Sequence, residues 1–135
     1  TSEIDNVVVG RTGVFIIEVK NMKGSILGDC ASRQWSQIKI DQYDIEHQKE
    51  FYSPIKQVGT HIYRLANYLR DNRIFTHING AVYFANRQTR VHLNGKENDI
   101  PVFTYKSTNA LINYITSGEE ALNNKQIEKI ISLLT

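Results

Sequence analysis

The chain has 135 residues, of which 41% are hydrophobic and 22% are charged, and these proportions are typical of a single globular domain. Its longest apolar runs, such as Gly13 to Ile17, fall far short of the roughly 18 residues that span a membrane, so we expect neither a transmembrane segment nor a signal peptide in these residues. The single cysteine, Cys30, excludes an internal disulfide and favours a reducing, cytoplasmic compartment. The formal charge of +2 permits nucleic-acid binding without demonstrating it.

The first half of the chain is rich in β-branched residues and predicts strands. Glu3 to Val9 and Val14 to Lys20 flank the segment Gly10 to Gly13, and this order predicts a β-hairpin. A second turn signal at Asn21 to Gly24 is followed by two strand patterns that continue the meander. These are Ser25 to Gly28 and Gln34 to Ile40, of which the second alternates imperfectly. Residues 41–52 are polar, and their structure is left open.

The most regular pattern in the chain predicts a helix that begins at Pro54. Ser53 is a favoured N-cap residue, and a proline suits the first position of a helix. Apolar residues then recur at spacings of three and four: Ile55, Val58, Ile62, Leu65 and Leu69. Gly59 costs a helix about 1 kcal/mol relative to alanine, so its presence predicts close packing of the helix against the sheet.

The second half of the chain predicts an alternation of strands and helices. Gly80 to Ala85 is apolar without alternation, as in a strand buried on both faces, and we expect it at the centre of the sheet. The remaining patterns are strands at Arg90 to Leu93 and Pro101 to Tyr105, and helices at about Asn109 to Thr116 and Lys125 to Leu134. This order of elements predicts an α/β fold with a mixed β-sheet flanked by helices.

The hairpin is expected to place two acidic residues opposite each other. If residues 10–13 form a symmetric turn, Val9 lies opposite Val14, and the same register puts Asp5 opposite Glu18. Directly opposed side chains have Cβ atoms roughly 4.5 to 5.5 Å apart, where like charges destabilise a sheet unless a cation lies between them. Lys20 lies two residues beyond Glu18 and therefore on the same face of the strand.

These three side chains predict a metal-dependent phosphodiester hydrolase. Two carboxylates suit Mg²⁺ or Mn²⁺ better than zinc. A metal held by Asp5 and Glu18 would activate a water and neutralise phosphate charge, while Lys20 would position the hydroxide or stabilise the transition state. A plainer interpretation stays open, because Glu-X-Lys is common at solvated sheet edges and Asp5 could lie in an exposed loop. The apolar residues that precede Glu18 on its face favour a site.

Taken together, these segments resemble the nuclease-related domain family (NERD), which looks like a branch of the PD-(D/E)XK, or restriction-endonuclease-like, nucleases. The resemblance is carried by Ile4 to Gly10, Gly13 to Asn21, Gly24 with Trp35, and Ser53 to Gln57. It runs from the start of the chain to about residue 86 and continues loosely through the final helices. An Asp followed by Glu-X-Lys is a weak signal by itself, but the hairpin, the tryptophan and the Pro-X-X-Gln helix start make it fairly specific.

The resemblance implies roles for five residues. Asp5 and Glu18 are implied to bind the metal, with the backbone carbonyl of Val19 as a further ligand. Lys20 is the implied catalytic lysine, and Gln57 matches a glutamine that is common in the helix of related nucleases. DNA is the implied substrate, RNA a less favoured one, and many related nucleases act as dimers. The family usually has a glutamate-bearing helix and a strand before the aspartate, so we expect an N-terminally truncated domain in which one acidic ligand, and with it the activity, can be missing.

Other polar residues are weaker candidates. Gln57, His61, Arg64 and Tyr68 form a stripe beside the apolar one, and this stripe could face the site or only solvent. Trp35 and Tyr43 could stack on bases, although Trp35 is better explained as a core residue. Basic residues elsewhere could contact phosphates: Lys23, Arg33, Lys39, Arg87 and Arg90. The histidines have no zinc-site spacing, and the cysteine lacks the surroundings of a nucleophile.

Two classes of function remain open at this point. The first is a Mg²⁺-dependent nuclease domain, and the second is a non-catalytic module that binds nucleic acid or protein within a larger chain. Catalysis requires all three charged groups, whereas a binding module would tolerate the loss of Glu18. A degenerate nuclease fold that serves as a scaffold is a third interpretation, against which the intact set of Asp5, Glu18 and Lys20 argues.

Overall fold

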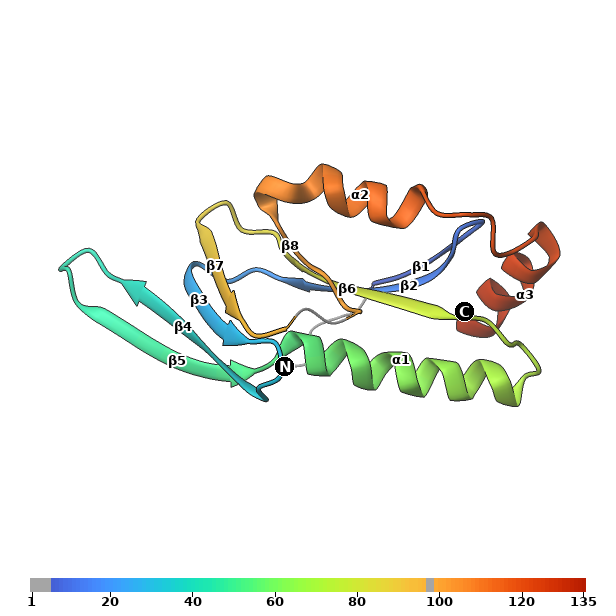
Figure 1. The fold of residues 1–135 in the computed structure, drawn as a ribbon, viewed down its shortest axis with the longest axis horizontal. Helices are drawn as coiled ribbons and strands as arrows, with labels where there is room; N and C mark the ends of the chain where they lie inside the picture. The colour runs from blue at the N-terminus through green and yellow to red at the C-terminus, as the bar shows by residue number, and fades with distance from the viewer. Residues whose placement is uncertain (1–5, 97–98) are drawn as a thin grey trace.

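The computed structural model describes residues 6–96 and 99–135, which form two four-stranded sheets, three α-helices and one short 3-10 helix (Figure 1). The first sheet has the strand order β1-β2-β6-β8, with β1 (Asn6–Gly10), β2 (Gly13–Lys20), β6 (Ile78–Phe84) and β8 (Val102–Thr104). The second has the order β5-β4-β3-β7, with β3 (Gly24–Asp29), β4 (Gln34–Ile40), β5 (Glu46–Tyr52) and β7 (Thr89–Asn94). The strands predicted from the sequence are therefore present, and they are divided between two sheets.

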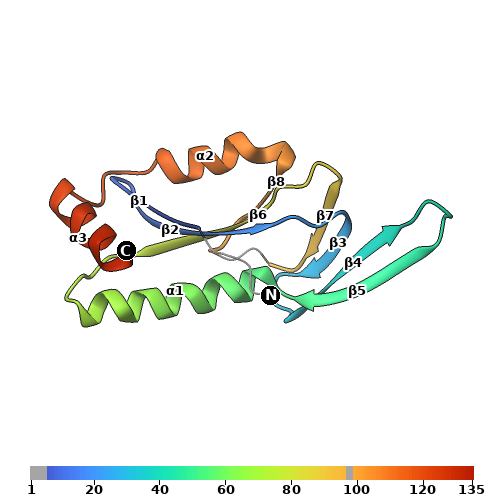
Figure 2. The ribbon, with the colours of Figure 1, turned by 180° about the vertical axis from the view of Figure 1, so that it is seen from behind.

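The helices cover both faces of the first sheet. α1 (Pro54–Asp71) lies on one face and α2 (Thr108–Thr116), which follows the 3-10 helix η1 (Tyr105–Ser107), lies on the other (Figures 1 and 2). α3 (Asn124–Leu134) contacts β1 at the end of the sheet. Because β1 is antiparallel to β2 while β6 and β8 are parallel to it, the sheet is mixed, which confirms the predicted α/β class and agrees with a restriction-endonuclease-like fold.

The hairpin of β1 and β2 has the register that the turn residues predict. Val9 pairs with Val14 and Gly10 with Gly13, so the loop is the two residues Arg11 and Thr12. Gly13 has a φ of 133°, a conformation that favours glycine over other residues. The predicted pair of Asp5 with Glu18 lies outside the described residues, since Asn6 opposite Ile17 is the last pair described.

β6 is the buried central strand that its apolar sequence predicts. It pairs in parallel with β2 on one side and with β8 on the other, as its position within the sheet requires. Gly80 lets α1 approach this strand closely, because a Cβ atom there would lie 2.4 Å from Val58 Cγ1 and 2.8 Å from Ile62 Cδ1. The absence of a side chain at Gly80 thus fixes how near the helix lies to the sheet.

α1 begins where its capping residues predict. The Ser53 hydroxyl accepts a hydrogen bond of 3.3 Å from the Lys56 backbone N–H, and Pro54 is the first helical residue. The prediction for Gly59 was wrong: a Cβ there would meet only Ile100 Cδ1 at 4.0 Å, an ordinary contact away from the sheet. The close helix-to-sheet contact is made through a glycine of the strand, not through one of the helix.

The second sheet extends from the body as an arm. The ambiguous residues 41–52 contain β5, which pairs along its whole length with β4, and this hairpin projects away from the helices (Figures 1 and 2). Trp35 anchors the base of the arm, as predicted: it is 1% exposed, stacks on Phe84 at 6.5 Å and donates a hydrogen bond from Nε1 to the Asp29 carbonyl. None of the described helices is long and apolar enough to cross a membrane.

Candidate active site

The face of β2 that lies toward α1 changes character along the strand. Val14 and Ile16 are fully buried and belong to the main hydrophobic core, together with Val58 of the helix. The next two residues of this face, Glu18 and Lys20, are charged, yet both are also buried. Charged side chains are almost never fully buried unless they are paired or bind a ligand, so this position stands out from the rest of the core.

Glu18 is a buried carboxylate with few partners. Its side chain has no solvent exposure, and neither carboxylate oxygen accepts a hydrogen bond within the part of the chain that the structure describes. Among the described residues it forms an ion pair with Lys20, in which Oε1 lies 3.4 Å from Nζ. An unmade hydrogen bond at a buried charged group costs more than about 1 to 3 kcal/mol, so a structural role alone does not account for Glu18.

Lys20 closes the strand at the carboxyl end of β2. Its carbonyl accepts a hydrogen bond of 3.0 Å from the Ala85 backbone N–H, which continues the parallel pairing of β2 with β6. The following residue, Asn21, accepts a hydrogen bond of 3.0 Å from the Asn86 side chain, so the loops after the two strands are tied together. Ligands of open α/β sheets bind outside the carboxyl ends of the strands, which is where Glu18 and Lys20 lie.

The polar stripe of α1 lies on the flank of the helix that is nearer to β1 and β2. Tyr68, a member of this stripe, donates a hydrogen bond of 3.0 Å to the Leu133 carbonyl of α3, and α3 contacts β1. On the opposite flank Gly59 lies toward Ile100, which precedes β8. Gln57 lies on the same flank of α1 as Tyr68. It therefore projects from the first turn of the helix toward β1 and β2, the second of which carries Glu18.

The structure describes less of the other two implied metal ligands, Val19 and Asp5. The side chain of Val19 packs toward α2 in the second hydrophobic cluster, so only its backbone could serve a site on the side of Glu18. Asp5 lies outside the described residues. Within residues 6–96 and 99–135, no three His, Cys, Asp or Glu side chains are grouped closely enough to form a metal site. Glu18 is thus the one acidic ligand candidate whose surroundings the structure describes.

The other sequence candidates lie apart from Glu18. Tyr43 is 74% exposed near the tip of the arm, and Trp35 is buried, so only the first could stack on a base. His47 hydrogen-bonds Asp41 at 2.8 Å in the same arm, which lowers the pKa of the Asp41 carboxyl below its ordinary value. Asp41 lies in the turn between β4 and β5, and His47 lies in β5.

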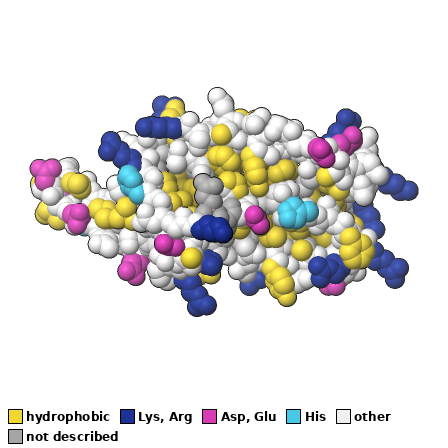
Figure 3. All heavy atoms as spheres, in the orientation of Figure 1, with side chains coloured by type: hydrophobic (Ala, Val, Ile, Leu, Met, Phe, Trp, Pro, Cys, Tyr) yellow, Lys and Arg dark blue, Asp and Glu magenta, His cyan; other side chains and the backbone are white. Residues whose placement is uncertain are grey.

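Basic residues are distributed around the molecule. On the face shown in Figure 3, Lys and Arg side chains lie mostly around the rim, while apolar side chains run along the middle. Arg87 is held over the ring of Tyr105 at 4.9 Å and lines a hollow with Arg90 and Lys106. Arg90 pairs with Ser25 in the second sheet, away from Glu18. Arg87, Arg90 and Lys106 therefore lie together at this hollow.

Some residues with a clear structural environment were missed by the sequence analysis. Lys56, Tyr52 and Tyr63 line a hollow beside α1 together with Arg33. They come from separate elements, and no spacing in the sequence connects them. The only available signal was the position of Lys56 and Tyr63 outside the apolar stripe of the helix, which is ordinary for any solvent-facing residue.

Comparison with known proteins shows the family of the chain. The family model of the nuclease-related domain matches residues 1–85, which is more than half of the chain, so the chain belongs to the nuclease-related domain family. It is also 34% identical over 62 residues to an uncharacterised protein of Bacillus anthracis. That alignment covers 46% of this chain and 27% of the Bacillus protein. No solved structure matches the chain.

Proposed function

We propose that this domain is a divalent-metal-dependent nuclease that hydrolyses phosphodiester bonds of DNA, and less readily of RNA. The observation that carries the proposal is Glu18, a fully buried carboxylate with two oxygens that accept no hydrogen bond from the described residues. It stands beside a lysine at the carboxyl end of a central strand, in a chain of the nuclease-related domain family. A buried charge that costs stability is best explained by a ligand that it binds.

The donor atoms fit a magnesium or manganese ion. Carboxylate and carbonyl oxygens are the ligands that these hard cations prefer, and the Glu18 carboxylate, which accepts no hydrogen bond from the described residues, supplies such a group. Asp5 and the Val19 carbonyl would complete the set, as the family resemblance implies. A bound Mg²⁺ would lower the pKa of a coordinated water and neutralise charge on a phosphodiester.

Lys20 and Gln57 supply the remaining polar groups. The Lys20 ammonium lies 3.4 Å from Glu18 Oε1, so the carboxylate holds it beside the proposed site. From there it would donate hydrogen bonds to a phosphate oxygen and stabilise the negative charge that develops during cleavage. The Gln57 amide, on the flank of α1 toward β1 and β2, would orient a phosphate or the attacking water without a change of its own charge.

The test is cleavage of plasmid DNA by the chain in Mg²⁺, with and without excess EDTA. We expect Glu18→Gln, Lys20→Met and Asp5→Asn each to lower the rate by about 100-fold or more, since each removes charge stabilisation at the site. The matched control is Glu50→Gln, which removes an exposed carboxylate of β5 and should cleave like the parent. Circular dichroism establishes that all variants are folded.

Two results would contradict the proposed reaction. One is a parent chain that does not cleave DNA or RNA in Mg²⁺ or Mn²⁺, which would favour a non-catalytic binding module instead. The other is full activity of Glu18→Gln, which would remove the buried carboxylate from the mechanism.

A further inference from the structure

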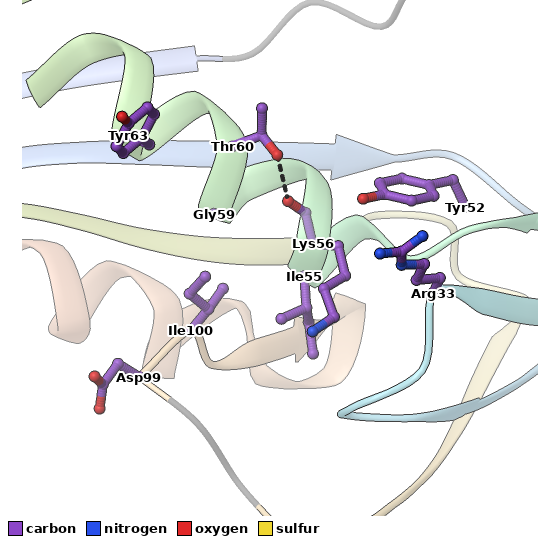
Figure 4. A pocket seen from close by; sticks show the side chains of 9 residues that line it. All are labelled: Arg33, Tyr52, Ile55, Lys56, Gly59, Thr60, Tyr63, Asp99 and Ile100. Atoms are coloured by element: carbon purple, nitrogen blue, oxygen red, sulfur yellow. Dashed lines mark hydrogen bonds between the residues drawn. The ribbon is translucent and has the colours of Figure 1, made fainter. Parts of the chain in front are cut away.

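A hollow of about 680 Å³ lies beside the first three turns of α1, and we call it the Tyr52–Tyr63 pocket. Two cationic side chains, Arg33 and Lys56, and two tyrosines, Tyr52 and Tyr63, are among the residues that line it (Figure 4). Its floor includes Ile55 and Gly59, and the glycine leaves space where any other residue of the helix would project a side chain. The pocket is on the flank of α1 that faces away from Glu18.

Two cations give this pocket a positive end. Arg33 and Lys56 are both exposed, and neither forms a salt bridge within the described residues. α1 begins at the same place, and its first turn contains no acidic residue to offset the positive end of the helix dipole. An anion bound here would be neutralised by two side chains that form no salt bridge with another described residue, and a phosphodiester is an anion of suitable size.

Two tyrosine rings are available in the same pocket. Tyr52 is 47% exposed and Tyr63 is 70% exposed, and neither takes part in a ring or cation contact with other described residues. Figure 4 shows the two rings at opposite ends of the hollow, with Arg33 beside Tyr52. Exposed aromatic faces next to unpaired cations are the combination by which proteins hold the bases and phosphates of single strands.

The acidic residue of the pocket makes its two ends electrostatically different. Asp99 lies at the end away from Arg33, beside Ile100 (Figure 4). Its charge disfavours a phosphate at that end and favours a hydrogen-bond donor such as the exocyclic amino group of a base. A nucleotide would therefore place its phosphate between Arg33 and Lys56 and its base toward Tyr63.

We propose that the Tyr52–Tyr63 pocket binds one nucleotide unit of a single-stranded nucleic acid. A single strand is required because the bases of a duplex are stacked on one another and cannot lie on a tyrosine ring. Lys56 and Gln57 are neighbours in the first turn of α1, one on the pocket side and one on the side of Glu18. A strand that crosses the start of α1 would thus contact the pocket and reach the proposed site of cleavage.

The cations are tested by fluorescence anisotropy with a labelled oligothymidylate of about 16 nucleotides, long enough to cover a single-strand binding site. Excess EDTA prevents cleavage. We expect the double variant Arg33→Gln/Lys56→Gln to bind about 10-fold or more weakly, and its salt dependence to fall by about 1.4 in the slope of log K against log salt. The control Lys125→Gln/Lys129→Gln removes two exposed cations of α3 and should bind like the parent. Equal weakening by both double variants would overturn the proposal.

The stacking is tested by Tyr63→Ala, with Tyr43→Ala at the arm as the control for an exposed tyrosine outside the pocket. We expect Tyr63→Ala to weaken single-strand binding about 10-fold and Tyr43→Ala to leave it unchanged. The parent should bind the oligothymidylate more tightly than a duplex of equal length and should prefer it to thymidine monophosphate. Equal binding of the duplex, or of the mononucleotide, would overturn the assignment to a single strand.

This inference rests on the proposed function for its choice of ligand, but the two can fail separately. If the chain binds the oligothymidylate through Tyr63 but cleaves neither DNA nor RNA, the proposal for the pocket holds and the proposed reaction is contradicted. A chain that cleaves DNA, and whose strand binding is unchanged in Tyr63→Ala and in Arg33→Gln/Lys56→Gln, overturns the pocket alone.

Discussion

The two faces of β2 are both buried, but they are built from different chemistry. Toward α2 the strand carries Phe15 and Ile17, which pack with Ala81 and Leu111 in an entirely apolar cluster. Toward α1 it begins in the same way with apolar residues and then continues with Glu18 and Lys20, which are also buried. On the face toward α2, apolar side chains of β2 stabilise the fold by their burial. On the face toward α1, this apolar packing ends at Ile16.

The difference shows where stability and function separate. Burial of apolar side chains contributes about 25 cal/mol for each Å² removed from water, and this accounts for the face toward α2. A buried ion pair is often no more stable than apolar residues of the same volume, because desolvation offsets the attraction of the charges. On this principle we expect Glu18 and Lys20 to add little to the stability of the fold, which is an argument for a functional role.

The largest expected loss of stability comes from a substitution on the apolar face of β2, which lies toward α2. Phe15→Ala removes a buried ring that packs edge-on against Tyr114 at 5.6 Å, so we expect a loss of about 3 to 5 kcal/mol in the free energy of unfolding. Urea denaturation followed by circular dichroism measures the loss. A loss below about 1 kcal/mol, the usual value for an exposed site, would show that this face contributes little.

Replacement of the two charged residues on the face of β2 toward α1 should not lower the free energy of unfolding. The double variant Glu18→Leu/Lys20→Met replaces a buried ion pair by apolar side chains of similar volume, and we expect it to be as stable as the parent or more stable by about 1 to 4 kcal/mol. The same urea denaturation measures this difference. A strong destabilisation would mean that the pair holds the fold together, and would weaken the argument for a functional site.

A matched pair of glycine variants tests the contact between α1 and the sheet. Gly80→Ala would place a Cβ 2.4 Å from Val58 Cγ1 and should cost about 1 to 3 kcal/mol through overpacking. Gly59→Ala has no contact closer than 4.0 Å and should stabilise the helix by about 1 kcal/mol. Thermal unfolding of both variants checks the prediction, which is wrong if the two shift in the same direction.

The smallest effect is expected at Tyr114, which covers the apolar face. Its hydroxyl donates a hydrogen bond of 3.1 Å to the Gly80 carbonyl, and Tyr114→Phe should lose about 1 kcal/mol. Burial, helped by the charge of Asp99, raises the pKa of Tyr114 above its ordinary value of 10.0. Folding therefore favours the neutral phenol, whose contribution is complete below pH 10 and falls as the pH rises further.

The measurement is the stability of parent and Tyr114→Phe between pH 8 and pH 11. The difference between them should stay constant up to about pH 10 and then shrink. A constant difference across the whole range would show that the phenol titrates equally in both states.

Local signals predicted the helix and the hairpin because each depends on neighbouring residues alone. Ser53 and Pro54 fixed the start of α1, and the two-residue turn after Gly10 fixed the register of β1 with β2. β5 could not be predicted, since most of its residues are exposed and leave no alternation to detect. It is a strand because β4 offers it a complete set of partners, which is information from another part of the chain.

The candidate site was predicted only in part. The period of two in a strand correctly brought Glu18 and Lys20 together, but nothing local shows that a glutamate is buried, because Glu-X-Lys is frequent at solvated edges. The catalytic roles of Glu18, Lys20, Asp5 and Gln57 remain predictions, as does metal binding by Asp5, Glu18 and Val19. The Tyr52–Tyr63 pocket could not be predicted from the sequence, because its residues come together only when the arm, the helix and the segment before β8 pack.

The most direct test of the central claim is calorimetric titration of Mn²⁺ into the parent chain, Glu18→Gln and the exposed control Glu50→Gln. If the buried carboxylate is retained for a divalent cation, the parent and Glu50→Gln bind Mn²⁺ alike, and Glu18→Gln is folded but gives no heat of binding. Equal binding by Glu18→Gln, or none by the parent, would contradict a metal site at Glu18.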